Sequence, residues 1–280
     1  IDCTFNIKDN LRNRIEEIRD EAETAVRGGA NHLILSDQNI SEERAIVPMI
    51  LAVGASHSHL VKLSLRGYAS INVQTAEAMD THSFSVLIGV GATTVNPYLA
   101  IDSIFQRYEK KLFGELDFPS CVERFKKSIN AGLLKIMSKM GISVLSSYRG
   151  GCNFEAVGLS RGLVADYFPG LISRISGIGV SGIEKKIREL HFKTYQKNVV
   201  MLPIGGLYKY RKSGEEHQFQ GNLIHLLQSS VGRNSYEIFK KYTKGINDLN
   251  PTNLRDLLEF RKINKPLNID DVEPIEKITP

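Results

Sequence analysis

The sequence predicts an α/β protein in which a few parallel βα units are followed by a mainly helical segment. Three observations lead to this prediction. Helical and strand patterns alternate through residues 9–98, the connections between the strands are long, and amphipathic helical spacing dominates after residue 116. Connections of that length favour right-handed crossovers between parallel strands. Three such units are too few for an eight-stranded barrel, so we expect a truncated, barrel-like domain.

Three helices are expected in the first half, and each has recognisable ends. Asp9 or Asn10 can cap the first helix, whose apolar residues recur at helical spacing until Gly28 stops it. Pro48 suits the first turn of the second helix, which runs to about residue 65. The third begins at Asp80 and ends in a pair of glycines at 89 and 91. This pair follows a helix rather than a strand, so it indicates a helix end and not a phosphate loop.

Three short strands alternate with these helices. The expected strands are the apolar or β-branched runs at residues 32–35, 70–75 and 93–95. In a parallel sheet their carboxyl ends lie at one edge, where α/β proteins place the groups that hold ligands. A site in this half would therefore be lined by Ser36, Asp37 and Asn96.

The stretch between the two halves has the most distinctive chemistry. A linker at 115–120 is followed by a long amphipathic helix that ends at Gly141. Hydroxyl groups, Arg149 and two glycines come next and could bind a phosphate or carboxylate. The same residues could equally form a short strand and turn in which Arg149 pairs with a carboxylate. Lys139, one helical turn from Lys135, is either solvated or part of a buried ionic contact.

The remaining elements are mostly helices. Helices are predicted at residues 100–113, 161–168, 181–196, 222–229, 236–243 and 253–260. Between them we expect a glycine-punctuated loop at 173–179, a short strand within 203–211 and an extended acidic linker at 266–273.

Composition and charge argue against two classes of partner. Of the 280 residues, 42% are hydrophobic and 24% are charged, which is typical of a globular protein. No apolar run approaches the ~20 residues that a membrane-spanning helix needs. The net charge of +5 is dispersed, whereas nucleic-acid binding favours a concentrated basic stripe. We therefore expect neither a nucleic-acid nor a membrane partner.

No catalytic or metal-binding constellation stands out. The three cysteines are far apart, no pair has metal-ligand spacing, and no signal peptide precedes them, which suggests reduced thiols in a cytosol-like compartment. His57 and His59 are two residues apart on a predicted helix and face different directions, so we expect no metal site there. No nucleophile comes with an obvious base, and no paired carboxylates share a helix face. The residues alone predict no catalytic group.

The central stretch resembles a known family. The residues that carry the resemblance are Lys135-x-x-Ser138-Lys139-Met140-Gly141-Ile142-Ser143, then Ser147-Tyr148, then Phe154-Glu155-x-x-Gly158-Leu159. With further matches in the same order, among them Asn96-Pro97-Tyr98 and Gly214-Glu215, they resemble the large chain of glutamate synthase. The resemblance covers nearly the whole chain.

The resemblance implies a division of the chain into two parts. Residues 1–115 would be the C-terminal part of the family's central domain, and residues 116–280 the N-terminal lead-in of its FMN-binding synthase domain, which is a TIM barrel. The chain begins without a methionine and ends in polar sequence, so we expect a piece of a longer protein.

The resemblance also implies a function. Enzymes of the family make glutamate from glutamine, 2-oxoglutarate and two electrons, and ammonia passes from a glutaminase site to an FMN site fed by an iron–sulphur cluster. This piece would link the two sites, help to wall the ammonia route and be inactive alone. No FMN or cluster is expected within it. Its partners would be the neighbouring glutaminase and FMN-barrel domains of the same chain. The parent enzyme would take electrons from ferredoxin or an NAD(P)H-oxidising subunit, and it would be found in the cytoplasm or plastid stroma.

Seven residues are predicted to line the tunnel or to bind substrate or an anion, from strand-end position and motif match. They are Ser36, Asp37, Asn96, Ser138, Lys139, Ser147 and Arg149. The alternative is an autonomous small α/β enzyme that binds an anionic metabolite at its strand-end loops, with Arg149 as the anchor.

Overall fold

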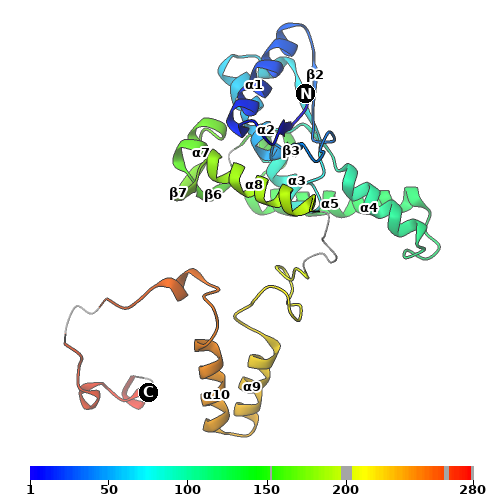
Figure 1. The fold of residues 1–280 in the computed structure, drawn as a ribbon. Helices are drawn as coiled ribbons and strands as arrows, with labels where there is room; N and C mark the ends of the chain where they lie inside the picture. Colours follow the sequence, from blue (N-terminus) through cyan, green and yellow to red (C-terminus); the bar gives the residue numbers. More distant parts are fainter. Residues whose placement is uncertain (152, 197–203, 262–264, 279–280) are drawn as a thin grey trace. The chain divides into compact units, whose positions relative to one another are not determined.

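The structure, a computed structural model, describes residues 1–151, 153–196, 204–261 and 265–278 (Figure 1). The chain forms two compact units, Ile1–Asn198 and Val199–Pro280. The first unit contains the expected βα units together with much of the segment that follows them. The division at residue 115, which concerns the family's domains, stays a prediction.

A three-stranded parallel sheet forms the centre of the first unit. Its strands are β2 (His32–Ser36), β4 (Ser70–Gln74) and β5 (Thr94–Asn96), in the order β2–β4–β5. The parallel register places all three carboxyl ends at one edge. The helices that alternate with these strands are α1 (Leu11–Arg27), α2 (Met49–Lys62) and α3 (Thr81–Gly89). The predicted α/β class and its parallel βα units are confirmed, and the strands of the described residues form no closed barrel.

The helix ends follow the capping chemistry that the sequence predicts. The Asn10 side chain accepts a hydrogen bond from the N–H of Arg12, and the Asp80 side chain accepts one from the N–H of Ser83. Each bond satisfies a donor that has no partner within its helix. A 3₁₀ turn, η1 (Arg66–Tyr68), follows α2 and leads into β4.

Helix α2 lies in the middle of the core, because its small residues let other elements approach closely. Residues 51–56 are all buried. At Gly54 a Cβ atom would lie 2.3 Å from Cε1 of Phe168, so the aromatic ring occupies the space that a side chain would need. Phe168 directly follows α7 (Arg161–Tyr167), which thereby packs on α2.

A small antiparallel pair was not predicted. It consists of β1 (Thr4–Asn6) and β3 (Arg44–Ile46). Each strand has only three residues, too few to show an alternating apolar pattern. An isolated parallel bridge between Asp2 and Ser36 joins the start of the chain to β2.

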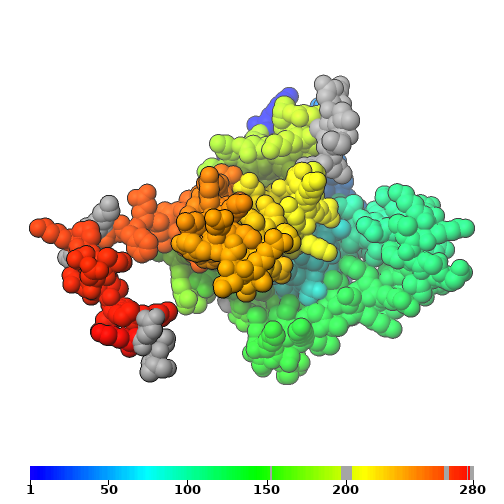
Figure 2. All heavy atoms as spheres, turned by 90° about the horizontal axis from the view of Figure 1, so that it is seen from below, coloured from blue at the N-terminus to red at the C-terminus, as the bar shows by residue number. Residues whose placement is uncertain are grey.

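Two helices extend from the sheet as an arm, drawn cyan to green in Figures 1 and 2. They are α4 (Tyr98–Glu109) and α5 (Phe118–Met140). The rings of Phe105 and Phe118 meet edge to face, with centroids 5.3 Å apart. Gly141 follows α5 with φ of 71°, a left-handed conformation that glycine adopts without steric cost. The predicted end of the long helix is confirmed.

The segment after α5 corrects two predictions and adds a strand that was not predicted. Residues 142–151 contain the short helix α6 (Leu145–Tyr148) rather than a strand. The expected loop at 173–179 is largely β7 (Ile172–Ile178), which pairs in parallel with the unpredicted β6 (Glu155–Leu159). Two register shifts interrupt this pair, so the alternation that identifies a strand is lost from the sequence. Helix α8 (Val180–Thr194) follows and confirms the prediction for residues 181–196.

The second unit contains a pair of packed helices, α9 (Gly221–Gly232) and α10 (Tyr236–Asn247), both predicted. The helix expected at 253–260 is only the 3₁₀ turn η2 (Leu254–Leu257). The expected linker at 266–273 contains η3 (Ile269–Asp271), and α11 (Ile275–Ile278) follows it. Residues 204–211 form no strand, and Pro203, the first residue of the expected strand, lies outside the described residues.

Candidate functional site

The carboxyl edge of the sheet contains a buried cluster around Asp37, the residue after β2. Asp37 is 1% exposed. Its carboxylate accepts a 2.5 Å hydrogen bond from the Thr75 hydroxyl and a 2.8 Å bond from the Tyr98 hydroxyl. The N–H of Ala76 donates to the same carboxylate, at 3.1 Å from Oδ2. Thr75 follows β4 and Tyr98 opens α4, so one buried charge ties three strand ends together.

The cluster is internally satisfied and negatively charged. Burial, and then the hydrogen bond to Asp37, raise the pKa of the Tyr98 phenol, so its hydroxyl remains a donor. Glu77 is exposed as a residue, but its carboxylate accepts a 2.6 Å bond from the N–H of Met49. Loss of water around that carboxylate, and then the nearby Asp37 charge, raise the pKa of Glu77. Such an edge repels anions and holds the loops together.

Two other residues were predicted at this edge, and neither side chain bonds to Asp37. Ser36 precedes Asp37 in the sequence, and Asn96 ends strand β5. Ser36 is partly buried, and its hydroxyl accepts a 3.3 Å bond from the N–H of Gln38. Asn96 is exposed, and its carbonyl accepts from the N–H of Thr75 at 3.0 Å. The predicted convergence of the strand ends is confirmed, but its polar groups mostly bond to one another.

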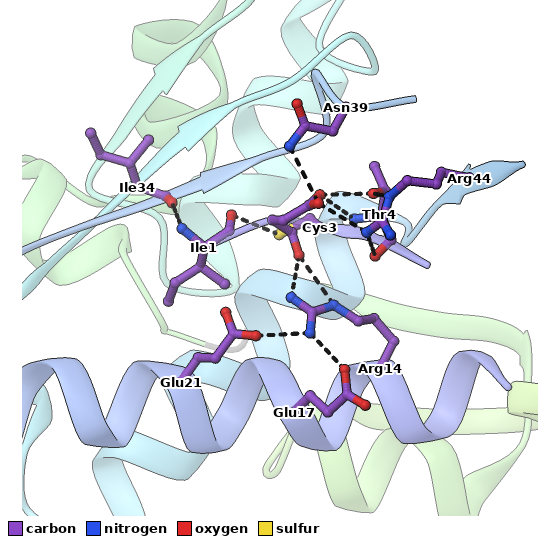
Figure 3. A network of polar contacts seen from close by, with 10 residues as sticks. Ile1, Cys3, Thr4, Arg14, Glu17, Glu21, Ile34, Asn39 and Arg44 are labelled. Carbon is purple, nitrogen blue, oxygen red and sulfur yellow. Dashed lines mark hydrogen bonds and ion pairs between the residues drawn. The ribbon is translucent and has the colours of Figure 1, made fainter. Parts of the chain in front are cut away.

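A second polar network joins β1 to its neighbours (Figure 3). The Asp2 carboxylate accepts bonds from Thr4 and Asn39 and forms an ion pair of 2.9 Å with Arg44. Burial by itself would raise the pKa of Asp2, but these hydrogen bonds and the Arg44 charge hold it below its usual value. Arg14 of α1 donates to the Asp2 carbonyl at 2.7 Å and also pairs with two glutamates. The network therefore fixes β1 to α1 and β3.

The amino edge of the sheet contains a cluster of positive charge. Arg66 of η1 donates to Nδ1 of His57 at 3.1 Å and to the carbonyl of Gly91 at 3.0 Å. It also donates to the carbonyl of Ala69. These acceptors lie in the second half of α2 and just before β4 and β5. All of them are neutral, so the Arg66 charge has no carboxylate partner among the described residues.

Arg149 contributes a second positive charge that acts on both His57 and Arg66. Gly150, the next residue, lies against the His57 ring, and a Cβ built on it would be 3.0 Å from His57 Nε2. Gly150 has φ of +69° and Gly91 has φ of +126°, so both combine a left-handed backbone with close approach to His57. The Arg149 side chain is partly buried and makes no hydrogen bond or ion pair with the described residues. The expectation that it pairs with a carboxylate is wrong for this part of the chain.

His57 stays uncharged in this environment. Because an arginine N–H is always a donor, Nδ1 of His57 must accept and the ring proton sits on Nε2. Burial, and then the charges of Arg66 and Arg149, lower the pKa of His57 to about 4. The ring also lines a mainly apolar cavity of about 180 Å³ with Gly150, Phe154 and Phe168.

The seven predicted contact residues do not form one site. Ser36, Asp37 and Asn96 lie at the carboxyl edge, whereas Arg149 lies at the amino edge. Arg149 therefore cannot anchor an anion at the strand-end loops. The others are on the exposed surface: Ser138, Lys139 and Ser147. The buried ionic role considered for Lys139 is wrong, because its side chain is solvated.

Sequence reasoning missed His57 and Arg66 as members of one cluster. His59, by contrast, pairs with Glu23 at 2.8 Å, so the two histidines face different partners, as predicted. Among the residues the structure describes, no three His, Cys, Asp or Glu side chains are placed to hold a metal ion. Helices long and apolar enough to cross a membrane are likewise absent from that part of the chain. Of the cysteines, Cys3 and Cys121 are buried free thiols, and Cys152 lies outside the described residues.

Comparison with known proteins gives the family. Residues 1–160 match the model of the glutamate synthase central domain. The chain is 53% identical over 281 residues to the glutamate synthase [NADPH] large chain of Azospirillum brasilense, and 39% identical to that of Bacillus subtilis. It is 36% identical over 293 residues to the ferredoxin-dependent glutamate synthase of Pyropia yezoensis. Each alignment covers 99% of this chain but only 18–19% of the relative. The chain belongs to the glutamate synthase central domain family and resembles a segment of about a fifth of a glutamate synthase large chain.

Proposed function

We propose that this chain is the linking segment of a glutamate synthase, the enzyme that converts glutamine and 2-oxoglutarate to two glutamates with two electrons. The observation that carries the proposal is the Asp37 cluster, in a chain that matches the central domain over residues 1–160. In other α/β proteins the groups at the strand ends bind a ligand. In this chain the corresponding groups form hydrogen bonds to one another. Such an edge suits a rigid spacer better than a catalytic site.

Uncovered apolar surface supports packing against other parts of a longer chain. On β6 and β7, Val157 is 65% exposed, and Ile172 and Ile175 are each 54% exposed. In the second unit, Phe260 is 101% and Leu254 76% exposed. Apolar clusters of this kind usually mark interfaces. We infer that the glutaminase and FMN-barrel domains of the parent chain cover them and that this segment walls part of the ammonia route.

We infer that the cofactors of the parent enzyme lie in its other domains. The two described cysteines are buried separately and do not make an iron–sulphur ligand set, which needs several thiolates together. We propose that FMN and the cluster are held by other domains of the parent enzyme, where they would supply the electrons for reducing an iminium to glutamate. The relatives named for NADPH and for ferredoxin suggest one of these two as the electron donor. Within the parent, this segment would position domains and exclude water.

An isotope experiment tests the proposed activity and the sealed route. The intact protein is given glutamine labelled with ¹⁵N in its amide, 2-oxoglutarate, reductant and an excess of unlabelled ammonium. We expect glutamate whose new amino group comes mainly from the labelled amide, because the ammonia does not mix with solvent. Glutamate carrying the solvent label ratio would contradict the sealed route, and no glutamate at all would contradict the activity.

A further inference from the structure

The arginines at the amino edge differ from the other buried or partly buried arginines that the structure describes in the first unit. Arg14, Arg19, Arg44 and Arg188 each pair with a carboxylate at 3.0 Å or less. At the amino edge the charge of Arg149 instead acts on Arg66, and neither guanidinium forms an ion pair with a carboxylate of the described residues. Two like charges in a partly buried place raise the free energy of the fold unless a counter-charge joins them.

Neutral groups fix the position of the Arg66 guanidinium and the orientation of the His57 ring. Arg66 is fixed by the carbonyls of Ala69 and Gly91 and by His57, so its charge cannot swing away into solvent. His57 keeps a proton on Nε2, on the side of the ring that faces Gly150. Arg149 adds a guanidinium fork without a described partner. A planar fork is the group that best matches a phosphate or carboxylate.

We propose that Arg149, Arg66 and His57 form a binding site for a phosphate-type oxyanion at the amino edge of the β2–β4–β5 sheet. Two positive charges and a neutral imidazole donor match a dianion better than a single carboxylate. Arg149 makes the bidentate contact, Arg66 contributes its fixed charge, and His57 donates from Nε2. The cavity that His57 and Gly150 line leaves about 180 Å³ beside the cluster for the rest of a phosphorylated small molecule. This site is independent of the proposed glutamate synthesis and lies at the edge opposite the Asp37 cluster.

The test is the reactivity of single arginines in the intact protein. Phenylglyoxal modifies guanidinium groups, and peptide mass spectrometry follows each arginine separately, so anion sites elsewhere in a longer chain do not confuse the result. Inorganic phosphate is titrated at about pH 8, where it is mainly a dianion, with chloride holding the ionic strength constant. We expect saturating phosphate to slow the modification of Arg149 on the order of tenfold, because it occupies the same N–H groups. Exposed Arg107 on α4 is the internal control and should not change.

Further arms identify the source of the anion and the role of the second charge. Glycerol phosphate is titrated separately: protection at lower concentration than inorganic phosphate identifies a phosphorylated metabolite, and equal protection identifies the free ion. The Arg66→Met variant should need roughly tenfold more phosphate for half-protection of Arg149, a loss equivalent to one partly screened charge, whereas Arg107→Met should need the same amount. The proposal is overturned if neither anion slows the modification of Arg149, or if the modification of Arg149 slows no more than that of Arg107. This result comes from the wild-type protein, so it decides the question even if Arg66→Met does not fold.

Discussion

Replacing Asp37 tests whether the carboxyl edge is a structural junction. In Asp37→Leu, which keeps the branched shape of the side chain, the hydroxyl of Thr75 and the N–H of Ala76 lose their acceptor. Thr75 is 0% exposed, so water cannot readily replace the carboxylate there. Each donor left without a partner costs about 1–3 kcal/mol, and we expect a total loss of about 2–5 kcal/mol in the free energy of local opening.

A second variant makes the prediction graded. In Asp37→Asn the remaining oxygen can still accept from Ala76 and from one of the two hydroxyl groups. The other hydroxyl, that of Thr75 or Tyr98, can rotate to accept from the new NH2 group. We therefore expect a loss of only about 1 kcal/mol, mainly from replacing charged hydrogen bonds by neutral ones. Asn96→Ala is the matched control, because Asn96 ends the neighbouring strand and is exposed.

Hydrogen exchange of the β2 and β4 amides, followed by mass spectrometry in the intact protein, measures these losses. A free-energy change of about 1.4 kcal/mol alters the opening equilibrium tenfold. Exchange should therefore become at least about 30-fold faster in Asp37→Leu and about fivefold faster in Asp37→Asn, with no change in Asn96→Ala. Equal exchange in all three variants would refute the reasoning that the buried carboxylate holds the strand ends together.

Two more predictions concern α2 and its surroundings. Gly54→Ala should destabilise the fold by about 1–3 kcal/mol in a denaturant titration, because the new methyl group would overlap the Phe168 ring. Gly162→Ala is the control and should be neutral or stabilising, because a Cβ added at this helical glycine would have no other atom within 4 Å. Equal effects of the two substitutions would contradict the packing argument. The lowered pKa of His57, from 6.5 to about 4, means that the unfolded chain binds more protons than the folded chain within that window, so stability should fall as pH falls through it. The stability of His57→Gln should fall less steeply with falling pH than that of the wild type, whereas the stability of His82→Gln, at an exposed histidine, should fall just as steeply as the wild type's. Parallel stability curves for all three proteins would show that His57 is not held neutral.

Much of the first unit could be predicted because its signals are local. Caps at Asn10 and Asp80, the glycine after α5 and the apolar runs of the strands depend on neighbours a few residues away. The same holds for the convergence of strand ends, which follows from parallel order alone. Strands β6 and β7 were not predicted, because Ile172, Ile175 and Ile178 are three residues apart. Two register shifts accompany this spacing, which differs from the alternation of two that identifies a strand.

The role of each polar group could not be predicted, because its partners are distant in sequence. Asp37 was expected to face a ligand, but Thr75 and Tyr98, 38 and 61 residues away, use its oxygens instead. Arg149 was expected to act with the strand ends, but it meets Arg66 and His57 at the other edge. Residue type and strand-end position indicate where charge lies along the chain, whereas only the folded contacts show whether that charge is already neutralised.

The most direct test of the linking role uses the uncovered apolar face of β6 and β7. Ile175→Lys in the intact protein should disturb packing against another domain without touching a reacting group, and Leu190→Lys, at a residue of α8 that is 65% exposed, is the matched control. We compare the rate of glutamine hydrolysis with the rate of 2-oxoglutarate consumption. We expect Ile175→Lys to lower 2-oxoglutarate consumption severalfold and to leave glutamine hydrolysis unchanged. Equal loss of both rates, or loss of neither, would contradict the claim that this segment connects two chemistries located in other domains.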